Sequence, residues 1–240
     1  MKTTLIASLA LSGALLSTAV HAREVSVEVT NLTNGIYYTP LLVAAHRPDV
    51  HLFEVGTPAS TQLQAMAEGG DISGLISDVE AAGGTYAADP AGGLLAPGAS
   101  ATAMLDVHAR RTSRLSIVAM LLPTNDGFIG IDSLPIPKRR GTYIYYARGY
   151  DAGTEANDEI VNGGGAPGVP GIPADPGGNN GTSGTGAAGP DHNSKVHVHR
   201  GVLGDADPAG GPSDLDSSVH RWHNPVARVV LRVGLGRDDD

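Results

Sequence analysis

Short segments in which apolar and polar residues alternate recur along this chain, and turn-forming sequence separates them. In residues 24–30, three valines alternate with polar side chains, which is the pattern of a half-buried strand. Further apolar or alternating segments occur at residues 103–108, 114–122, 128–134, 142–148, 194–200 and 226–233. About seven short strands separated by turns favour an all-β protein, specifically an antiparallel β-sandwich. Residues 103–108 and 114–122 flank a polar turn and are expected to pair as a hairpin.

Two segments depart from the strand pattern and predict one or two short helices. Residues 60–68 begin with a serine and are followed by two glycines, which are typical start and stop signals of a helix. Asp71 and Ser73 are candidate caps for a second helix that extends to Ala82. Both helices are weakly amphipathic, and we expect them to cover one end or edge of a sheet.

Much of the remaining chain has the composition of loops, since the sequence contains 33 Gly and 16 Pro. Residues 162–193 consist mostly of Gly, Pro, Ala and Asn. Such a segment cannot bury enough surface to offset its chain entropy, so we expect a long, flexible Gly/Pro-rich insertion within the domain. Residues 204–216 form a second irregular segment. Its four aspartates lack the ligand spacing of a calcium-binding loop, and we expect them to be solvated.

Residues 1–22 have the features of a secretory signal peptide. Lys2 provides a positive start, an apolar run follows, and small residues lead to Ala22. We expect cleavage after Ala22, which would release the mature chain into the periplasm or the extracellular space. No later segment is apolar enough to span a membrane. The mature chain is interpreted as one domain, residues 23–236, followed by a short acidic tail, residues 237–240.

The charge and the cysteine count exclude several classes of function. The chain has no cysteine, so disulfides and thiol chemistry are impossible, and stability must come from the core or from a bound metal. The formal net charge is −9. Nucleic acid is excluded as a partner, because phosphate binding requires concentrated Lys and Arg. The basic run at residues 138–140 is short and is typical of a solvated turn.

Two acidic loops contain the side chains that most specifically indicate a function. Residues 122–134 include Asp126 in a Thr-Asn-Asp-Gly turn, and residues 150–155 include Asp151 and Glu155. Both loops lie where predicted strands end. Carboxylates that are close together repel one another, and a hard divalent cation such as Ca²⁺ relieves that repulsion. Alternatively, Asp126 stabilises its own turn, and Asp151 or Glu155 caps a helix or turn.

The sequences of these loops resemble two motifs of the spondin domain, the unit shared by F-spondin and mindin. Residues 123–134 are similar to the "PSPDWFVG.DSL" motif of that family, and residues 150–155 are similar to its "YDAGTD" motif. Residues 76–83 resemble the helix of the family, and residues 224–232 resemble its closing strand. The four blocks follow the family's order, so the resemblance covers nearly the whole mature chain.

The resemblance implies a C2-like antiparallel β-sandwich with a divalent-cation site in its loops. By position, the metal ligands of the family fall on Asp126, Asp151 and Glu155. Gly127 replaces a tryptophan of the family motif, and Glu155 replaces an aspartate with a longer carboxylate that can still bind a cation. Family members act in extracellular adhesion. The resemblance therefore implies a non-catalytic binding module for an extracellular protein or a surface glycan.

Two other interpretations remain open. A secreted hydrolase, either a carboxylate-based glycosidase or an esterase, could use the same acidic loops, although common catalytic motifs are absent and aromatic residues make up only 4% of the chain. His197, His199, His220 and His223 are close enough in sequence to bind Zn²⁺ or Cu²⁺, but an exposed strand face is the commoner explanation for the first two. Trp222 is expected to pack the last loop against the sandwich.

Overall fold

The computed structural model describes residues 23–108, 111–187 and 193–234. Within these residues the chain forms ten β-strands and two α-helices. The strands are β1 (Arg23–Asn31), β2 (Tyr37–Tyr38), β3 (Leu42–His46), β4 (Thr85–Ala88), β5 (Ser100–Val107), β6 (Arg114–Leu122), β7 (Gly127–Pro135), β8 (Gly141–Asp151), β9 (His197–Val198) and β10 (Ala227–Val233). The helices are α1 (Thr61–Gly69) and α2 (Ser73–Ala81). The predicted signal peptide, residues 1–22, and the predicted acidic tail, residues 237–240, lie outside the described residues.

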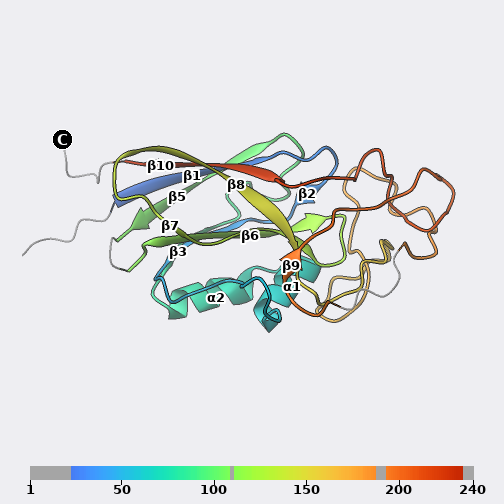
Figure 1. Cartoon of the computed structure of the whole chain (residues 1–240), viewed down its shortest axis with the longest axis horizontal. Coiled ribbons are helices and arrows are strands. Elements are labelled where there is room, and N and C mark those ends of the chain that lie inside the picture. The colour runs from blue at the N-terminus through green and yellow to red at the C-terminus, as the bar shows by residue number, and fades with distance from the viewer. Residues whose placement is uncertain (1–22, 109–110, 188–192, 235–240) are drawn as a thin grey trace, which may run out of the picture.

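The strands pair antiparallel throughout the described residues, which confirms the predicted all-β class. The strand order is β4-β3-β6-β7-β8-β10-β1-β5, with β2 beside β6 and β9 beside β8. In Figure 1 the sheet folds over into two layers, with β10, β1 and β5 above and β3, β6 and β7 below. The two ends of this order approach each other, since Thr85 Oγ1 in β4 donates to the carbonyl of Asp106 in β5 at 3.1 Å. The two-layered sheet is therefore nearly closed into a barrel.

Strand β8 belongs to both layers. Residues 141–147 pair with β10 in the upper layer, and residues 148–151 pair with β7 in the lower layer. The strand crosses the front of the molecule in Figure 1 and ends where the long loops gather. Because β8 connects the two layers, the position of its last residues is determined by both.

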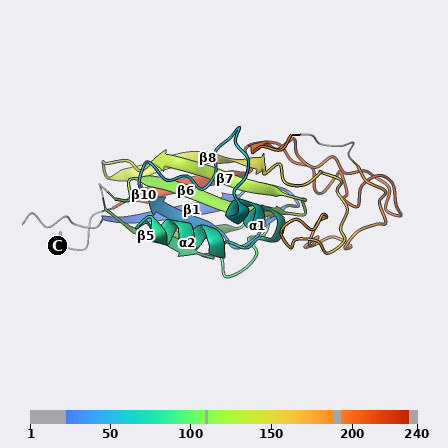
Figure 2. The same cartoon turned by 90° about the horizontal axis from the view of Figure 1, so that it is seen from below.

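The hydrophobic core has two parts. Between the layers, alternate residues of β1 such as Val25 and Val27 are completely buried. Below the lower layer, α1 and α2 cover the sheet with side chains such as Leu63 and Leu75 (Figure 2). Strand β6 lies between these two parts and is buried on both faces. Its position explains why residues 114–122 are apolar almost without interruption.

Helices α1 and α2 confirm the two predicted helices. The side-chain oxygen of Ser60 accepts a hydrogen bond from Leu63 N at 3.1 Å, and Gly70 ends α1 with a left-handed φ of 74°. Before α2, the carboxylate of Asp71 accepts a hydrogen bond from Ser73 N at 2.9 Å. In the described part of the chain, no helix combines the length and the apolar character that crossing a membrane requires.

Two details of the strand prediction are wrong. Residues 103–108 and 114–122 do not form a hairpin, because β5 pairs with β1 whereas β6 pairs with β3 and β7. Strand β5 lies in the upper layer and β6 in the lower one. Strand β4 was not expected from the sequence, since it is only 4 residues long and pairs with β3 alone. In both cases the pairing is between strands distant in sequence.

The predicted insertion, residues 162–193, contributes to the core as well as to the surface. Its described part contains no helix or strand, but Ile172 is completely buried. Gly168 N donates a hydrogen bond of 2.6 Å to the buried carboxylate of Glu68 in α1. The segment is thus attached to the body of the domain at two points, and its flexibility stays a prediction.

The second irregular segment, residues 204–216, is less solvated than expected. Asp214 is 6% exposed, so the expectation that all its aspartates face water is wrong. The Asp214 carboxylate accepts backbone hydrogen bonds from three residues: Val161, Thr182 and Gly184. Main-chain donors satisfy this buried charge and lower the pKa of Asp214, although burial by itself raises it.

Trp222 packs the last loop against the sheet, as predicted. Its side chain is 5% exposed and lies over Gly149 of β8. A Cβ atom on Gly149 would come within 2.4 Å of the indole. The absence of a side chain at this position therefore allows the loop to contact β8.

We predict that Gly149→Ala lowers the free energy of unfolding by about 1–3 kcal/mol, because overpacking displaces the indole of Trp222. Thermal and denaturant unfolding measure the change. Gly234→Ala is the matched control, since a Cβ there would meet only Glu24 O at 3.7 Å. Equal unfolding curves for Gly149→Ala and the wild type would contradict the packing described here.

Candidate metal centre

Asp126 and Asp151 meet at the loop end of the sheet. Asp126 directly precedes β7, and Asp151 is the last residue of β8. The first residue of β7, Gly127, is paired with Asp151 across the antiparallel ladder. Ala152 N also donates to the carbonyl of Asp126 at 3.2 Å. The structure thus brings together two of the three predicted ligands.

The Asp126 carboxylate is completely buried, and only one of its oxygens is satisfied. Oδ2 accepts hydrogen bonds from Thr154 N at 2.7 Å, from Thr154 Oγ1 at 3.2 Å and from Glu155 N at 3.1 Å. Oδ1 has no hydrogen-bond partner among the described residues. Burial, followed by the charge of Asp151, raises the pKa of Asp126 to about 7. A positive ion at Oδ1 would offset both effects.

The Asp151 carboxylate is held by the segment that follows it. Its Oδ1 accepts a hydrogen bond from Gly153 N at 2.8 Å, and its Oδ2 accepts one from Asn157 Nδ2 at 2.7 Å. His197 Nδ1 lies 3.7 Å from Asp151 Oδ1 and also contacts the carbonyl of Lys195 at 2.8 Å. Each oxygen of Asp151 therefore has a donor, and the carboxylate is fixed beside Asp126.

The backbone N–H of Glu155 donates a hydrogen bond to Asp126, but the carboxylate of Glu155 contacts other residues. Oε2 accepts hydrogen bonds from Gly171 N at 3.0 Å and from Asn125 Nδ2 at 3.4 Å. Oε1 is buried and has no hydrogen-bond partner among the described residues. Burial, followed by the charge of Glu68, raises the pKa of Glu155 to about 7.

No group of three or more His, Asp or Glu side chains in the described part of the chain is arranged so that it could hold a metal ion. Asp126 and Asp151 are adjacent, whereas the Glu155 carboxylate forms its hydrogen bonds elsewhere. Cation binding by these three residues therefore stays a prediction. The turn-capping alternative describes Asp151, which accepts a hydrogen bond from Gly153 N two residues later. Asp126 does not bond its own turn in this way, because its carboxylate accepts backbone hydrogen bonds from Thr154 and Glu155.

Asn125 is a residue of this centre that the sequence analysis did not single out. Its Nδ2 donates to Asp158 Oδ1 at 2.9 Å, and its Oδ1 accepts a hydrogen bond from Glu159 N at 3.2 Å. Asn125 therefore holds the segment after β8 against the loop that carries Asp126. Its place next to Asp126 in the Thr-Asn-Asp-Gly turn was the signal that could have identified it.

The replacement of a tryptophan by Gly127 has a structural reason. A Cβ atom on Gly127 would lie 2.6 Å from Thr124 Oγ1 and 3.2 Å from the ring of His199. His199 is buried, and its ring centroid lies 5.1 Å from that of Trp222. The imidazole of His199 therefore occupies space beside the acidic loop that a larger side chain at Gly127 would need.

The predicted histidine site for Zn²⁺ or Cu²⁺ gains no support in the described residues. His199 packs against Trp222 with its ring tilted by 36° and is buried, so the expectation of an exposed strand face is wrong for this residue. His220 is buried with its Nε2 at 3.2 Å from Asp175 Oδ1, and its Nδ1 accepts a hydrogen bond from Asp216 N. His199 and His220 thus have structural roles in two loops.

In the metal-free protein, the buried carboxylate of Asp126 is expected to make stability fall as pH rises. Its pKa is about 7 in the folded state against 3.8 for an ordinary aspartate, so the folded state binds the proton more tightly. The free energy of unfolding contributed by this group should decrease between these two values and stay constant above them. Asp126→Asn should therefore gain stability relative to the wild type as the pH rises through this window.

Thermal unfolding in the presence of a chelator measures this difference. Asp106→Asn, at an exposed position of β5, is the control for loss of one negative charge. A constant difference between Asp126→Asn and the wild type across the pH range would contradict the raised pKa.

Comparison with known proteins identifies a family model and two relatives that are similar to this chain. The family model described as Spondin_N matches residues 17–159, which include Asp126, Asp151 and Glu155 but not the closing strand β10. Spondin-2 of Rattus norvegicus is 33% identical over 103 residues, which are 41% of this chain and 31% of that protein. Spondin-2 of Homo sapiens is 31% identical over 126 residues, which are 50% of this chain and 38% of that protein. The aligned part is thus about a third of the length of each relative. Since the family model matches more than half of the chain, this protein belongs to the spondin family.

Proposed function

We propose that this protein is an exported, non-catalytic binding module with an adhesion-type role outside the cytoplasm. A divalent cation, preferably Ca²⁺, would bind at the ends of β7 and β8. Membership of the spondin family supports the extracellular adhesion role. The observation that carries the cation proposal is the buried Oδ1 of Asp126. This atom has no hydrogen-bond partner in the part of the chain that the structure describes, and the carboxylate lies beside the charge of Asp151.

The chemistry of these side chains fits a hard cation. Ca²⁺ takes oxygen ligands, including carboxylates, main-chain carbonyls and waters. Asp126 and Asp151 would supply two carboxylates whose mutual repulsion the ion removes. Glu155 would join them if its carboxylate left Gly171 N and Asn125 Nδ2, and the buried, unpartnered Oε1 of Glu155 favours such an exchange. The role of the ion would be to fix the loops between which these residues lie.

The hydrolase alternative receives less support. The three described cavities, of about 420, 450 and 340 Å³, are lined by other residues, and none of them includes Asp126, Asp151 or Glu155. A substrate would need access to these carboxylates, and Asp126 and Asp151 are buried. The raised pKa values of Asp126 and Glu155 are explained by burial and by neighbouring charges without a catalytic role.

One serine has neighbours that resemble those of a nucleophile. Ser116 Oγ lies 2.7 Å from His46 Nε2 and 3.2 Å from Asp132 Oδ1. Ser116 and His46 are both completely buried, so no substrate could reach the hydroxyl. Asp132 instead holds the loop that follows β3, because it accepts a hydrogen bond from Leu52 N at 3.0 Å and contacts His51 Nδ1. This network supports a structural role.

Titration calorimetry with Ca²⁺ and Mg²⁺ on the mature, chelator-treated protein tests the cation site. We expect the wild type to bind Ca²⁺ and to melt at a higher temperature with it. Asp126→Asn and Asp151→Asn should weaken binding by about tenfold or more, the effect of losing one charged ligand. Asp106→Asn should bind as the wild type does. Absence of binding heat and of any melting shift in the wild type would refute the cation proposal.

Glu155→Gln distinguishes a site with two carboxylates from one with three. A loss as large as that of Asp126→Asn indicates that the Glu155 carboxylate turns toward the ion when it binds. Wild-type affinity in Glu155→Gln assigns the cation to Asp126 and Asp151 alone.

The adhesion role is tested separately, by the attachment of protein-coated beads to extracellular-matrix preparations. Attachment no greater than that of uncoated beads would contradict it.

A further inference from the structure

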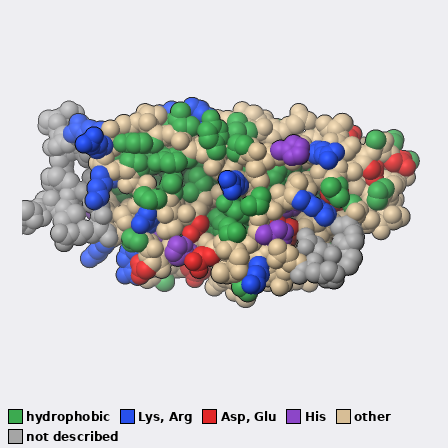
Figure 3. Space-filling view, in the orientation of Figure 1, with side chains coloured by type: hydrophobic (Ala, Val, Ile, Leu, Met, Phe, Trp, Pro, Cys, Tyr) green, Lys and Arg blue, Asp and Glu red, His purple; other side chains and the backbone are tan. Residues whose placement is uncertain are grey.

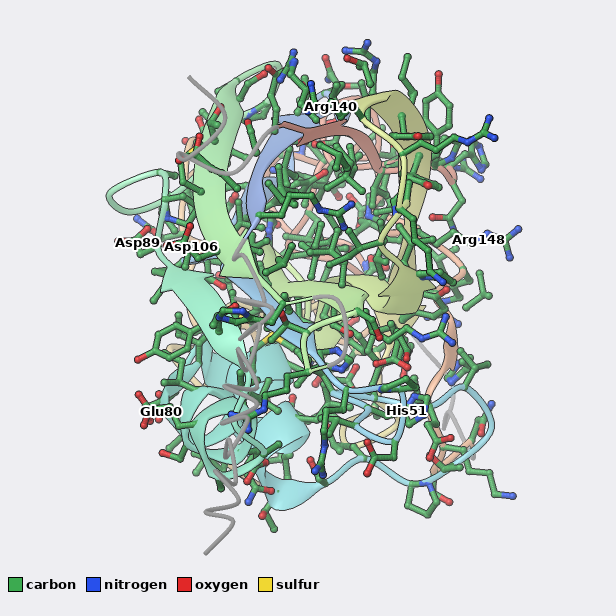
Figure 4. The ribbon with its side chains drawn as sticks, turned by 90° about the vertical axis from the view of Figure 1, so that its left-hand side faces the viewer. His51, Glu80, Asp89, Asp106, Arg140 and Arg148 are labelled. Carbon is green, nitrogen blue, oxygen red and sulfur yellow. The ribbon has the colours of Figure 1, made fainter. Side chains whose placement is uncertain are left out.

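The outer face of β8 presents an exposed aromatic ring and a guanidinium beside it. Successive residues of a strand point to opposite faces, so Tyr146 and Arg148 lie on the same side of the sheet. Tyr146 is 59% exposed, and Arg148 is exposed as well. Figure 4 shows the Arg148 side chain extended away from the ribbon toward solvent. The protein thus displays one of its few aromatic rings where it does not contribute to the core.

A second arginine flanks the same ring. Arg228 of β10 is the direct cross-strand partner of Tyr146, which makes it a diagonal neighbour of Arg148. Diagonal neighbours in an antiparallel pair are about 7–8 Å apart, a distance that two long side chains bridge easily. Two guanidinium groups can therefore approach one ligand that lies across Tyr146.

Neither guanidinium is neutralised within the described residues. The side chains of Arg148 and Arg228 form no hydrogen bond and no ion pair there. Arg232, four residues after Arg228 on the same face of β10, pairs instead with Glu28 Oε2 at 3.1 Å. In a chain with a net charge of −9, two adjacent arginines without a carboxylate partner form a local excess of positive charge.

The surface is hollowed next to these side chains. A depression of about 450 Å³ is lined by Tyr146, Arg148, Val198, Asn224 and Pro225. Its lining residues come from β8, from β9 and from the segment just before β10. Val198 is 45% exposed and adds apolar surface to the lining of the depression. On the face seen in Figure 3, hydrophobic and basic side chains lie near one another, whereas acidic side chains lie toward its lower edge and its right-hand end.

We infer that this depression binds an acidic polysaccharide whose sugar rings carry carboxylates, such as a polyuronate. An arginine fork pairs with a carboxylate through two parallel hydrogen bonds, and Arg148 and Arg228 are available for such bonds. The tyrosine ring offers a flat apolar face for the C–H face of a sugar. The shallow, open shape suits a polymer that lies across the surface. An acidic peptide satisfies the guanidinium groups but makes no use of the ring face.

This inference rests on the proposed adhesion role, to which it gives a class of partner, but it does not depend on the cation. Tyr146, Arg148 and Arg228 are distinct from the carboxylates at the loop end. Binding of the polysaccharide is therefore expected in the presence of a chelator, and it should weaken as ionic strength rises, because exposed charges are screened by salt.

Binding of the mature protein to polygalacturonate at low ionic strength, with chelator present, tests the inference. Retention on immobilised polymer and titration calorimetry give the affinity. We expect Tyr146→Ala, Arg148→Ala and Arg228→Ala each to bind about tenfold more weakly, as for the loss of one charged hydrogen bond or one stacked ring. Arg232→Ala is the matched control, since that arginine already pairs with Glu28. All four positions are on the surface, and unfolding curves verify that the variants fold.

Three results would overturn the inference: no binding of the wild type to polygalacturonate, equal binding by the wild type and the three site variants, or equally tight binding of poly-glutamate through the same residues. The third result would assign the surface to acidic peptides. Neutral dextran should not be retained. Its retention would also overturn the inference, because it would show that the guanidinium groups do not select the ligand. Polygalacturonate binding without any Ca²⁺ heat would refute only the cation proposal, whereas Ca²⁺ binding without polymer retention would refute only this inference.

Discussion

The antiparallel pairing at the end of β8 is the constraint on which the rest of the structure depends. Strand β8 pairs with β10 in one layer and with β7 in the other, so it fixes the layers relative to each other. The same ladder places Asp151 beside Gly127 and therefore beside Asp126. On the outer face of β8, Tyr146 and Arg148 take their positions from the same hydrogen bonds. One strand thus positions both surfaces to which we assign a binding role.

Buried carboxylates organise the loops at this end of the molecule. Asp126, Glu159 and Asp214 are nearly or completely buried and accept hydrogen bonds from main-chain N–H groups of segments distant in sequence. A buried anion without partners is costly, so each carboxylate holds its surrounding segments in place. This explains how Gly- and Pro-rich sequence acquires a defined course without helices or strands. Asp126 differs from the other two because one of its oxygens remains without a donor.

Local sequence patterns predicted the elements well but not their partners. Residues 114–122 correspond to β6, because a run of apolar residues suits a strand buried on both faces. The expected hairpin with residues 103–108 was wrong, since pairing between distant strands depends on how the layers stack. The buried positions of Ile172 and Asp214 were missed for the same reason. Composition indicates how much a segment can bury, but not which surface will cover a single side chain.

The sequence by itself determined the all-β class, the two helices, the family motifs and the location of Asp126 and Asp151 at strand ends. These features follow from alternation, capping and turn residues, which act over a few positions of the chain. Only the tertiary structure decided that the Glu155 carboxylate lies apart from the aspartate pair and that Arg148 lies beside Tyr146 without a counter-ion. Those properties depend on which distant segments supply hydrogen bonds and charges. Local sequence patterns do not predict such contacts.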